Sequence, residues 1–446
     1  MTKTEQILVS IVGLICAALY YPVLSGLPIW DDTPVWFYDF SLGHSYSYIF
    51  SNYTWPFSVA FQKFLFTQWG HRYSVYHAVN ISIHLVNALL LYNILTDLKI
   101  RGRIAIGLLF LFHPANVITV AWMIQLKTLL SFLFAAVSVR LLILYQQNRL
   151  AWAGATVSFI LSVLSKSASL ILPALIIFRP QKWDRRFFIT VTVAGAIGLL
   201  AAIKILSSPE LQGPANALGY FNVQVILRTI SYYFWQSFLP LSTIPVKDLD
   251  LDTGLWFDLL TLSGILFLIY HLRGTIAGKA LLAAQVFLLP FYGIIPAPYM
   301  GHSLVGDQHL YLVLPLYLVF VMNIPLKREA IRVFLVILFL PFFAHQVRNT
   351  LPYYENDPTF YRTIIDKYPG CLAIGMNLGF YYTSHGEVQN AMDLIAKMDA
   401  HIVKEPKVKD NPFYPVYTAF REEVFKLKVE PKKEIDFLKT DKEPKF

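Results

Sequence analysis

Long runs of apolar residues alternate with short polar segments along most of the 446-residue chain. A helix needs about 20 residues to cross the hydrocarbon core of a bilayer, and many of these runs approach that length. The runs are continuously apolar, whereas strands of a membrane barrel would alternate between apolar and polar positions. The pattern therefore predicts an all-α polytopic membrane protein with about eleven transmembrane helices. The predicted spans are 6–25, 74–96, 103–116, 128–146, 150–165, 168–178, 187–206, 254–272, 279–297, 310–325 and 330–346.

Charged residues predict the orientation of these spans. Lysine and arginine are concentrated in cytoplasmic loops of membrane proteins. If Met1 is cytoplasmic, eleven spans place every strongly basic short loop on the cytoplasmic side. The segment 222–240 would reverse this arrangement if it crossed the membrane, so we predict that it lies at the outer interface or re-enters from that side. The predicted cytoplasmic loops contain Lys99, Arg101, Arg103, Arg149, Arg179, Lys182, Arg185, Arg186, Arg273, Lys279, Lys327 and Arg328.

Composition agrees with a membrane protein. Hydrophobic residues make up 56% of the chain and charged residues 15%, whereas soluble domains contain about 25% charged residues. The formal net charge of +9 is carried largely by the short loops, where it orients the chain. We therefore expect no nucleic-acid partner.

The pattern divides the chain into a transmembrane domain, residues 1–346, and a more polar tail. A long outer loop, 26–73, interrupts the transmembrane domain after its first span. Within this loop, segment 48–69 carries aromatic and apolar residues at helical spacing. Such a helix either lies flat on the membrane or packs on the helix bundle.

The tail has two predicted parts. Residues 347–403 contain three helical stretches with a pattern similar to a tetratricopeptide repeat (TPR), so we expect a small helical periplasmic segment. Residues 404–446 are rich in Lys, Glu and Pro, and we expect a flexible charged tail. The repeat-like positions are Asn377, Leu378, Gly379, Tyr382, Gly386 and Ala391.

Two adjacent acidic residues, Asp31 and Asp32, follow the first predicted span. Carboxylates close to the lipid phase are costly unless they are solvated or used. A carboxylate also suits a general base that takes a proton from a hydroxyl group. Asp31 and Asp32 are therefore candidate catalytic residues, with a helix cap or a solvated loop as the alternative.

Basic residues are predicted near the same outer boundary. Lys127 precedes the fourth span, Lys166 ends the fifth, Arg72 precedes the second and Arg228 lies in the interfacial segment. Lysine offers phosphate a point charge, and arginine can bind it with two hydrogen bonds. These four residues are candidate ligands for a lipid-linked phosphate. Alternatively, each extends its charge toward lipid headgroups.

Polar residues recur on one face of the second predicted span. His77, Asn80, His84 and Asn87 are spaced by three or four positions. Polar side chains inside membrane bundles commonly form hydrogen bonds between helices. Since no carboxylate or cysteine accompanies the two histidines, we favour this packing role over a metal site.

The polar loop 301–311 opens the tenth span and is flanked by glycines. It is either a binding loop or a turn in which Asp307 caps the following helix. The candidate sugar- or substrate-binding residues in this loop are His302, Asp307, Gln308, His309 and Tyr311, and the resemblance described next adds His113.

Several of these segments together resemble a group of C-type glycosyltransferases that includes the transmembrane-and-TPR O-mannosyltransferases and their bacterial relatives. The resemblance covers most of the chain and implies a lipid-linked sugar donor. In chain order, the similar motifs are Asp31-Asp32, Tyr76 to Ala88 (H-x-x-N-x-x-x-H-x-x-N), Phe112-His113-Pro114, Val120-Ala121-Trp122, Lys127-Thr128-Leu129-Leu130, Leu164-Ser165-Lys166-Ser167 and Asp307-Gln308-His309-Leu310-Tyr311-Leu312.

The chain departs from that group at three positions. Ile118 and Ser167 stand where the group has glutamates, and Gln308 stands where it has an arginine. If that arginine holds phosphate, another cation such as Lys166 or Arg228 must replace it here. The short tail is more similar to bacterial inner-membrane enzymes, including type IV pilin glycosyltransferases that use a polyprenyl-phosphate pentose.

These observations predict an inverting glycosyltransferase that moves a sugar, of the mannose or arabinofuranose class, from polyprenyl phosphate to Ser or Thr of an exported protein such as a pilin. The scheme requires no cofactor, although a divalent metal at Asp31 and Asp32 stays open. The expected location is the bacterial inner membrane, with a cytoplasmic N-terminus and a periplasmic site and C-terminus. The alternatives are modification of lipid A or a cell-wall glycan, a lipid-linked-sugar flippase, and a non-catalytic scaffold.

Overall fold

The computed structural model describes residues 3–32, 43–144, 148–166, 222–241, 243–247, 254–294, 303–325, 329–411 and 413–429, together with the single residues 192 and 196. Within these ranges every regular element is a helix, which confirms the predicted all-α class. The spans predicted at 168–178 and 187–206 lie outside the described residues. Each of the other predicted spans contains a helix.

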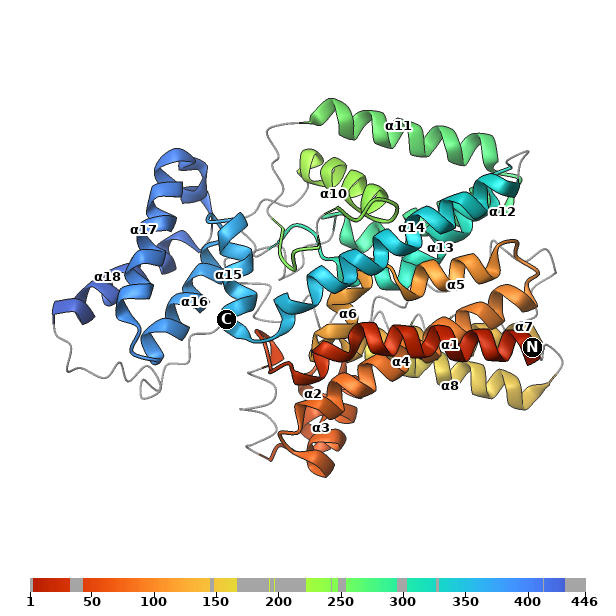
Figure 1. Ribbon diagram of the computed structural model, residues 1–446, viewed down its shortest axis with the longest axis horizontal. Coiled ribbons are helices and arrows are strands. Elements are labelled where there is room, and N and C mark those ends of the chain that lie inside the picture. The colour runs from red at the N-terminus through yellow and green to blue at the C-terminus, as the bar shows by residue number, and fades with distance from the viewer. Residues whose placement is uncertain are drawn as a thin grey trace.

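The helices up to α14 form the apolar part of the protein, and the longer ones among them run roughly along one direction (Figure 1). The N-terminus lies at the end of this bundle that faces away from the C-terminal helices. The helices are α1 (Lys3–Tyr20), α2 (Tyr46–Asn52), α3 (Pro56–Trp69), α4 (Tyr73–Asp97), α5 (Arg103–Leu111), α6 (Val117–Ala121), α7 (Leu126–Leu144), α8 (Arg149–Ser165), α10 (Val223–Gln236), α11 (Leu255–Leu272), α12 (Ile276–Leu288), α13 (Leu310–Asn323) and α14 (Glu329–Thr350).

Several helices have the length and composition of membrane spans. Among the described residues, four stretches qualify: Tyr73–Asp97, Met123–Leu144, Leu255–Leu272 and Ala330–Tyr354. The pair Arg103–Leu111 and Pro114–Ala121 makes a fifth if these two helices, bent by 50°, are counted as one span. The structure therefore supports a membrane protein with several spans.

Large apolar side chains are exposed along α11 and α14. Trp256, Leu260 and Phe267 are exposed on α11, and Phe334 and Ile337 are exposed on α14. Apolar surfaces of this extent are rare on soluble monomers. A lipid phase is the environment in which such faces are stable.

The polar face of α4 joins the bundle by hydrogen bonds, as predicted. His84 Nε2 lies 3.1 Å from the carbonyl oxygen of Leu111, and Asn87 Nδ2 donates to the carbonyl oxygen of Leu129 at 3.0 Å. Because His84 Nε2 donates to a carbonyl, His84 Nδ1 accepts from the Tyr311 hydroxyl at 2.8 Å. Asn80 Nδ2 donates to the carbonyl oxygen of Trp122 at 3.2 Å. These histidines and asparagines therefore tie α4 to α5, α7 and α13.

Segment 48–69 packs on the bundle, which is the second of the two alternatives given for it. On α3, Gln62 Nε2 donates to the carbonyl oxygen of Met123 at 3.2 Å. The Ser58 hydroxyl lies 3.4 Å from the carbonyl oxygen of Ser165. Helix α3 thus contacts both the N-terminal end of α7 and the C-terminal end of α8.

The segment predicted to stay at the outer interface contains α10, which has 14 residues. A helix of this length is shorter than the roughly 20 residues of a complete span. Arg228 of α10 donates from Nε to Asp258 Oδ2 of α11 at 2.8 Å. This ion pair joins α10 to its neighbour.

The tail forms a bundle of four helices beyond the end of α14 (Figure 1). The predicted helical stretches match the first three of them. Within the segment 404–446, which we expect to be a flexible charged tail, residues 414–429 form α18, and its Tyr417, Phe420 and Val424 side chains are buried. The four helices are α15 (Asp357–Lys367), α16 (Leu372–Ser384), α17 (Val388–Lys404) and α18 (Tyr414–Val429).

Candidate functional site

The loop that follows α1, residues 26–32, lies against α4 and against the short helical turn that precedes α15. Gly26 makes both approaches feasible, since a Cβ atom there would lie 3.0 Å from His77 Nε2 and 3.1 Å from the carbonyl oxygen of Tyr354. Leu27 N donates to the carbonyl oxygen of Glu355 at 2.9 Å. The loop is therefore fixed to both the transmembrane helices and the tail.

Asp32 is fully buried and anchors this loop. Its Oδ1 accepts from Ile124 N at 2.8 Å, and its Oδ2 accepts from Ile29 N at 3.1 Å. Burial raises the pKa of Asp32 well above the ordinary value, and the two backbone donors act in the opposite direction. Since both oxygens are engaged by the backbone, Asp32 has a structural role.

Asp31 differs from its neighbour because its side chain is exposed. Protein nevertheless surrounds it closely, so desolvation raises its pKa above the ordinary 3.8, while the charge of Lys127 lowers it. Asp31 can therefore meet a substrate and accept a proton, which is what a general base requires.

Lys127 and Lys166 form the cationic side of the site. Lys127 lies in the first turn of α7, with its ammonium group 4.0 Å from the centre of the Trp55 ring. It interacts electrostatically with Asp31 and Asp32. Lys166 ends α8 and donates to Thr128 Oγ1 at 2.9 Å. The two ammonium groups are close enough to repel each other, so an anion between them would be stabilised.

His309 borders these lysines. Its ring stacks on Phe291 with centroids 4.0 Å apart, and it experiences the charges of both Lys166 and Lys127. Of the predicted sugar-binding residues that the structure describes, His309 is thus the one that lies on the cationic side of the site. The neighbouring Gln308 folds back over Gly306, where a Cβ atom would lie 2.5 Å from its amide nitrogen.

Asp307 belongs to a buried polar cluster that the sequence did not reveal. Its carboxylate accepts from Lys247 Nζ at 2.6 Å, from Gln236 Nε2 at 3.0 Å and from the Tyr232 hydroxyl. Asp307 and Lys247 are both buried, and each satisfies the other. This cluster ties the loop before α13 to α10, so Asp307 has a structural role there.

The remaining predicted residues lie elsewhere or have other partners. The imidazole of His113 is buried, accepts from Ala115 N at 3.2 Å and packs against Phe343. Tyr311 is engaged with α4, Arg228 is paired with Asp258, and Arg72 is exposed at the start of α4. His302 lies outside the described residues. None of these contacts brings His113, Tyr311, Arg228 or Arg72 to Asp31.

Trp30, next to Asp31, has a backbone φ of +46°. This left-handed conformation costs a bulky residue about 1–3 kcal/mol unless its surroundings fix it. Its indole ring stacks on that of Trp122, with centroids 5.6 Å apart and planes inclined by 13°. The strain therefore lies immediately beside the exposed carboxylate.

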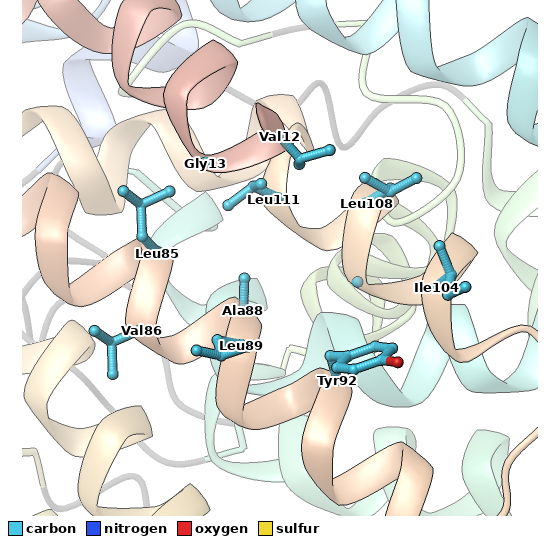
Figure 2. A pocket seen from close by; sticks show the side chains of 11 residues that line it. Val12, Gly13, Leu85, Val86, Ala88, Leu89, Tyr92, Ile104, Leu108 and Leu111 are labelled. Carbon is cyan, nitrogen blue, oxygen red and sulfur yellow. The ribbon is translucent and has the colours of Figure 1, made fainter. Parts of the chain in front are cut away.

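An apolar groove of about 270 Å³ lies between α1, α4 and α5 (Figure 2). Figure 2 shows Val12, Leu85, Leu108 and Leu111 around it, with Gly13 on its α1 wall. Gly13 has no heavy atom within 4 Å of the position that a Cβ would occupy, so the groove is open at this point. A hydrocarbon chain is the kind of ligand that such a lining accepts.

The arrangement places an exposed carboxylate and two lysines at one end of an apolar helix bundle. Among the residues that the structure describes, no three His, Cys, Asp or Glu side chains are grouped closely enough to hold a metal ion. Comparisons of the chain with protein-family models, with curated proteins and with solved structures found no match.

Proposed function

We propose that this protein is an inverting glycosyltransferase that transfers a sugar from polyprenyl phosphate to a Ser or Thr hydroxyl of an exported protein. One observation carries the proposal: the exposed Asp31 lies within electrostatic range of Lys127, which is itself close to Lys166. This pairs a proton acceptor with two cations suited to a departing phosphate. The sequence resemblance to C-type glycosyltransferases points to the same chemistry.

In the proposed reaction, the acceptor hydroxyl oxygen attacks the anomeric carbon of the sugar. Asp31 takes the hydroxyl proton as the new carbon–oxygen bond forms. The bond between the anomeric carbon and the phosphate oxygen breaks, and its electron pair leaves with the polyprenyl phosphate. Lys127 and Lys166 stabilise the negative charge that develops on this leaving group. A single displacement of this kind inverts the anomeric centre, and none of its steps requires a metal ion.

The lipid part of the donor would occupy the groove between α1, α4 and α5. The groove is lined by apolar side chains, and α1 continues from it directly toward the loop that contains Asp31. A prenyl chain bound along α1 would therefore have its phosphate end on the side of the two lysines. Burial of a hydrocarbon contributes about 25 cal/mol per Å² of apolar surface removed from water.

The finer assignments complete the proposal. The fold would have about eleven spans in a bacterial inner membrane, with the N-terminus cytoplasmic and Asp31 and the tail periplasmic. The four tail helices would receive the exported acceptor. By the resemblance to type IV pilin glycosyltransferases, this acceptor would be a pilin. The sugar would be of the mannose or arabinofuranose class.

Transfer of label from a defined donor tests the function. Purified protein in liposomes is incubated with polyprenyl phosphate carrying a radioactive sugar and with an extract of exported proteins. We expect radioactive label in the protein fraction, and this label should not be removed by washing with detergent. With the corresponding nucleotide sugar as donor, we expect no label. Equal transfer from the nucleotide sugar, or label that appears only in glycolipid, would contradict the proposal.

Filling the groove tests the binding of the lipid tail. Gly13→Phe places an aromatic side chain in open space within the groove. We expect a higher KM for a long-chain donor and an unchanged kcat/KM for a donor with a short prenyl chain, because only the long chain needs the groove. Gly264→Phe is the matched control, since Gly264 lies on α11 and also has no heavy atom within 4 Å. An equal response of the two variants would remove the groove from the proposal.

A further inference from the structure

The loop that carries Asp31 is held by the C-terminal bundle as well as by the transmembrane helices. Trp30 N donates to Asp357 Oδ1 at 2.7 Å, across 327 residues of sequence. Asp357 is the first residue of α15, and the preceding Asn356 caps that helix by accepting from Thr359 N. A carboxylate in the first turn of a helix is favoured by the orientation of the peptide dipoles. Asp357 is therefore a fixed acceptor.

The hydrogen bond to Asp357 reaches the one residue of this loop whose backbone conformation needs support. Trp30 has a φ of +46°, and nothing in its side chain favours a positive value. Asp357 fixes the Trp30 N–H group, and Phe360 of the same helix lies against the Trp30 ring with centroids 5.9 Å apart. Trp122 stacks on the Trp30 ring, lies 6.2 Å from the Phe360 ring between centroids, and donates from Nε1 to the carbonyl oxygen of Ile29 at 3.3 Å.

Asp357 is itself held in place. It interacts with the Tyr361 hydroxyl one turn along α15 as well as with Trp30 N. Burial raises the pKa of Asp357, and the hydrogen bonds from Trp30 and Tyr361 act in the opposite direction. Asp357 thus accepts from both Trp30 and Tyr361 and fixes the position of Trp30. Asp31 is the next residue in the chain, so its position is fixed as well.

We propose that Asp357 is a positioning residue for Asp31, and that the C-terminal bundle is by this contact a necessary part of the catalytic unit. Asp357 holds Trp30 in its left-handed conformation and thereby directs the Asp31 carboxylate. The catalytic part of this inference depends on the proposed function, because it takes Asp31 as the base. The conformational part does not, and it has its own readout.

Substitutions of Asp357 in the full-length protein test both parts. Asp357→Ala removes the acceptor, Asp357→Asn keeps an oxygen that can accept from Trp30 N, and Asp357→Glu keeps the charge on a longer arm. Asp366→Asn, an exposed residue of the same helix that pairs with Lys397, is the control. The measurements are kcat and donor KM for transfer, and the near-ultraviolet circular dichroism of the stacked Trp30 and Trp122 rings.

We expect Asp357→Ala to lower kcat on the order of a hundred-fold with little change in donor KM, since a base displaced by about 1 Å loses this much. The dichroism of the Trp pair should also weaken. Asp357→Asn should retain most of the wild-type kcat and dichroism. Asp357→Glu should give values between those of Asp357→Ala and Asp357→Asn, although it keeps the native charge. Asp366→Asn should behave as wild type.

Two results would overturn the inference: Asp357→Ala with native kcat and native dichroism, or Asp357→Asn and Asp357→Glu as impaired as Asp357→Ala. If Asp357→Ala does not fold, the test rests on the other two variants. Asp357→Asn must then show a higher kcat and a stronger Trp dichroism than Asp357→Glu. Absence of transfer by the wild-type protein would contradict the proposed function instead. In that case, loss of dichroism in Asp357→Ala and its recovery in Asp357→Asn would still support the positioning of Trp30.

Discussion

Asp31→Asn is expected to lower kcat by about 10²- to 10⁴-fold without loss of folding, because a positioned general base contributes that much to proton transfer. The exposed Asp31 side chain anchors none of the backbone groups that hold the loop, whereas Asp32 accepts from Ile29 N and Ile124 N. Asp32→Asn places an amide NH₂ group against one of these donors and should lower the stability of the protein by about 1–3 kcal/mol. Transfer assays and melting temperatures in detergent separate the two effects.

The pH profile gives an independent check on Asp31. The base must be ionised, so kcat/KM falls as the pH drops through the Asp31 pKa. Burial raises this pKa above the ordinary 3.8, so the fall begins at a higher pH than an unperturbed carboxylate would give. Full activity in Asp31→Asn, or a stable and inactive Asp32→Asn protein, would contradict the assignment.

Loss of either lysine at the site is expected to reduce kcat/KM for the lipid-linked donor by about 10²- to 10³-fold, the usual effect of removing a group that stabilises developing charge. Lys166→Met removes the ammonium group that Thr128 orients, and Lys127→Met removes the one over Trp55. Methionine keeps most of the length of the side chain, so packing is largely preserved. Initial rates at several donor concentrations measure the effect.

Lys63→Met is the matched control for these two variants. Lys63 lies on α3, which contacts α7 and α8, and its ammonium group is 5.6 Å from the Tyr46 ring centre. It should leave donor kinetics unchanged. Lys127 also lowers the Asp31 pKa, so Lys127→Met should move the acid limb of the profile to higher pH, while Lys63→Met should not. Equal kinetics in all three variants would exclude a phosphate role for the lysine pair.

The positions of most helices were predictable because helix formation depends on residues that are close in sequence. Apolar runs and three-and-four spacing depend on neighbouring residues, so α4, α7 and α11 appear at their predicted places. Helix α18 was missed because its three buried residues, Tyr417, Phe420 and Val424, stand in a segment whose other residues are mostly polar or charged. Their spacing of three and four was the available signal.

The site was predictable in its residue types and less so in their roles. Asp31 and Asp32 are equivalent in sequence, and the backbone donors Ile29 N and Ile124 N, the latter from the turn between α6 and α7, distinguish Asp32. The partner of Asp307 is Lys247, 60 positions away, which no local pattern indicates. Asp357 acts on Trp30 from the far end of the chain. Burial and long-range pairing, which decide these roles, are properties of the folded protein.

The most direct test of the central claim is the intact mass of exported proteins from cells that produce either the wild-type protein or Asp31→Asn at equal abundance. We expect one or more exported proteins whose mass is larger by a hexose or a pentose in wild-type cells and is unmodified in the Asp31→Asn cells. A sugar increment that persists undiminished with Asp31→Asn would contradict it.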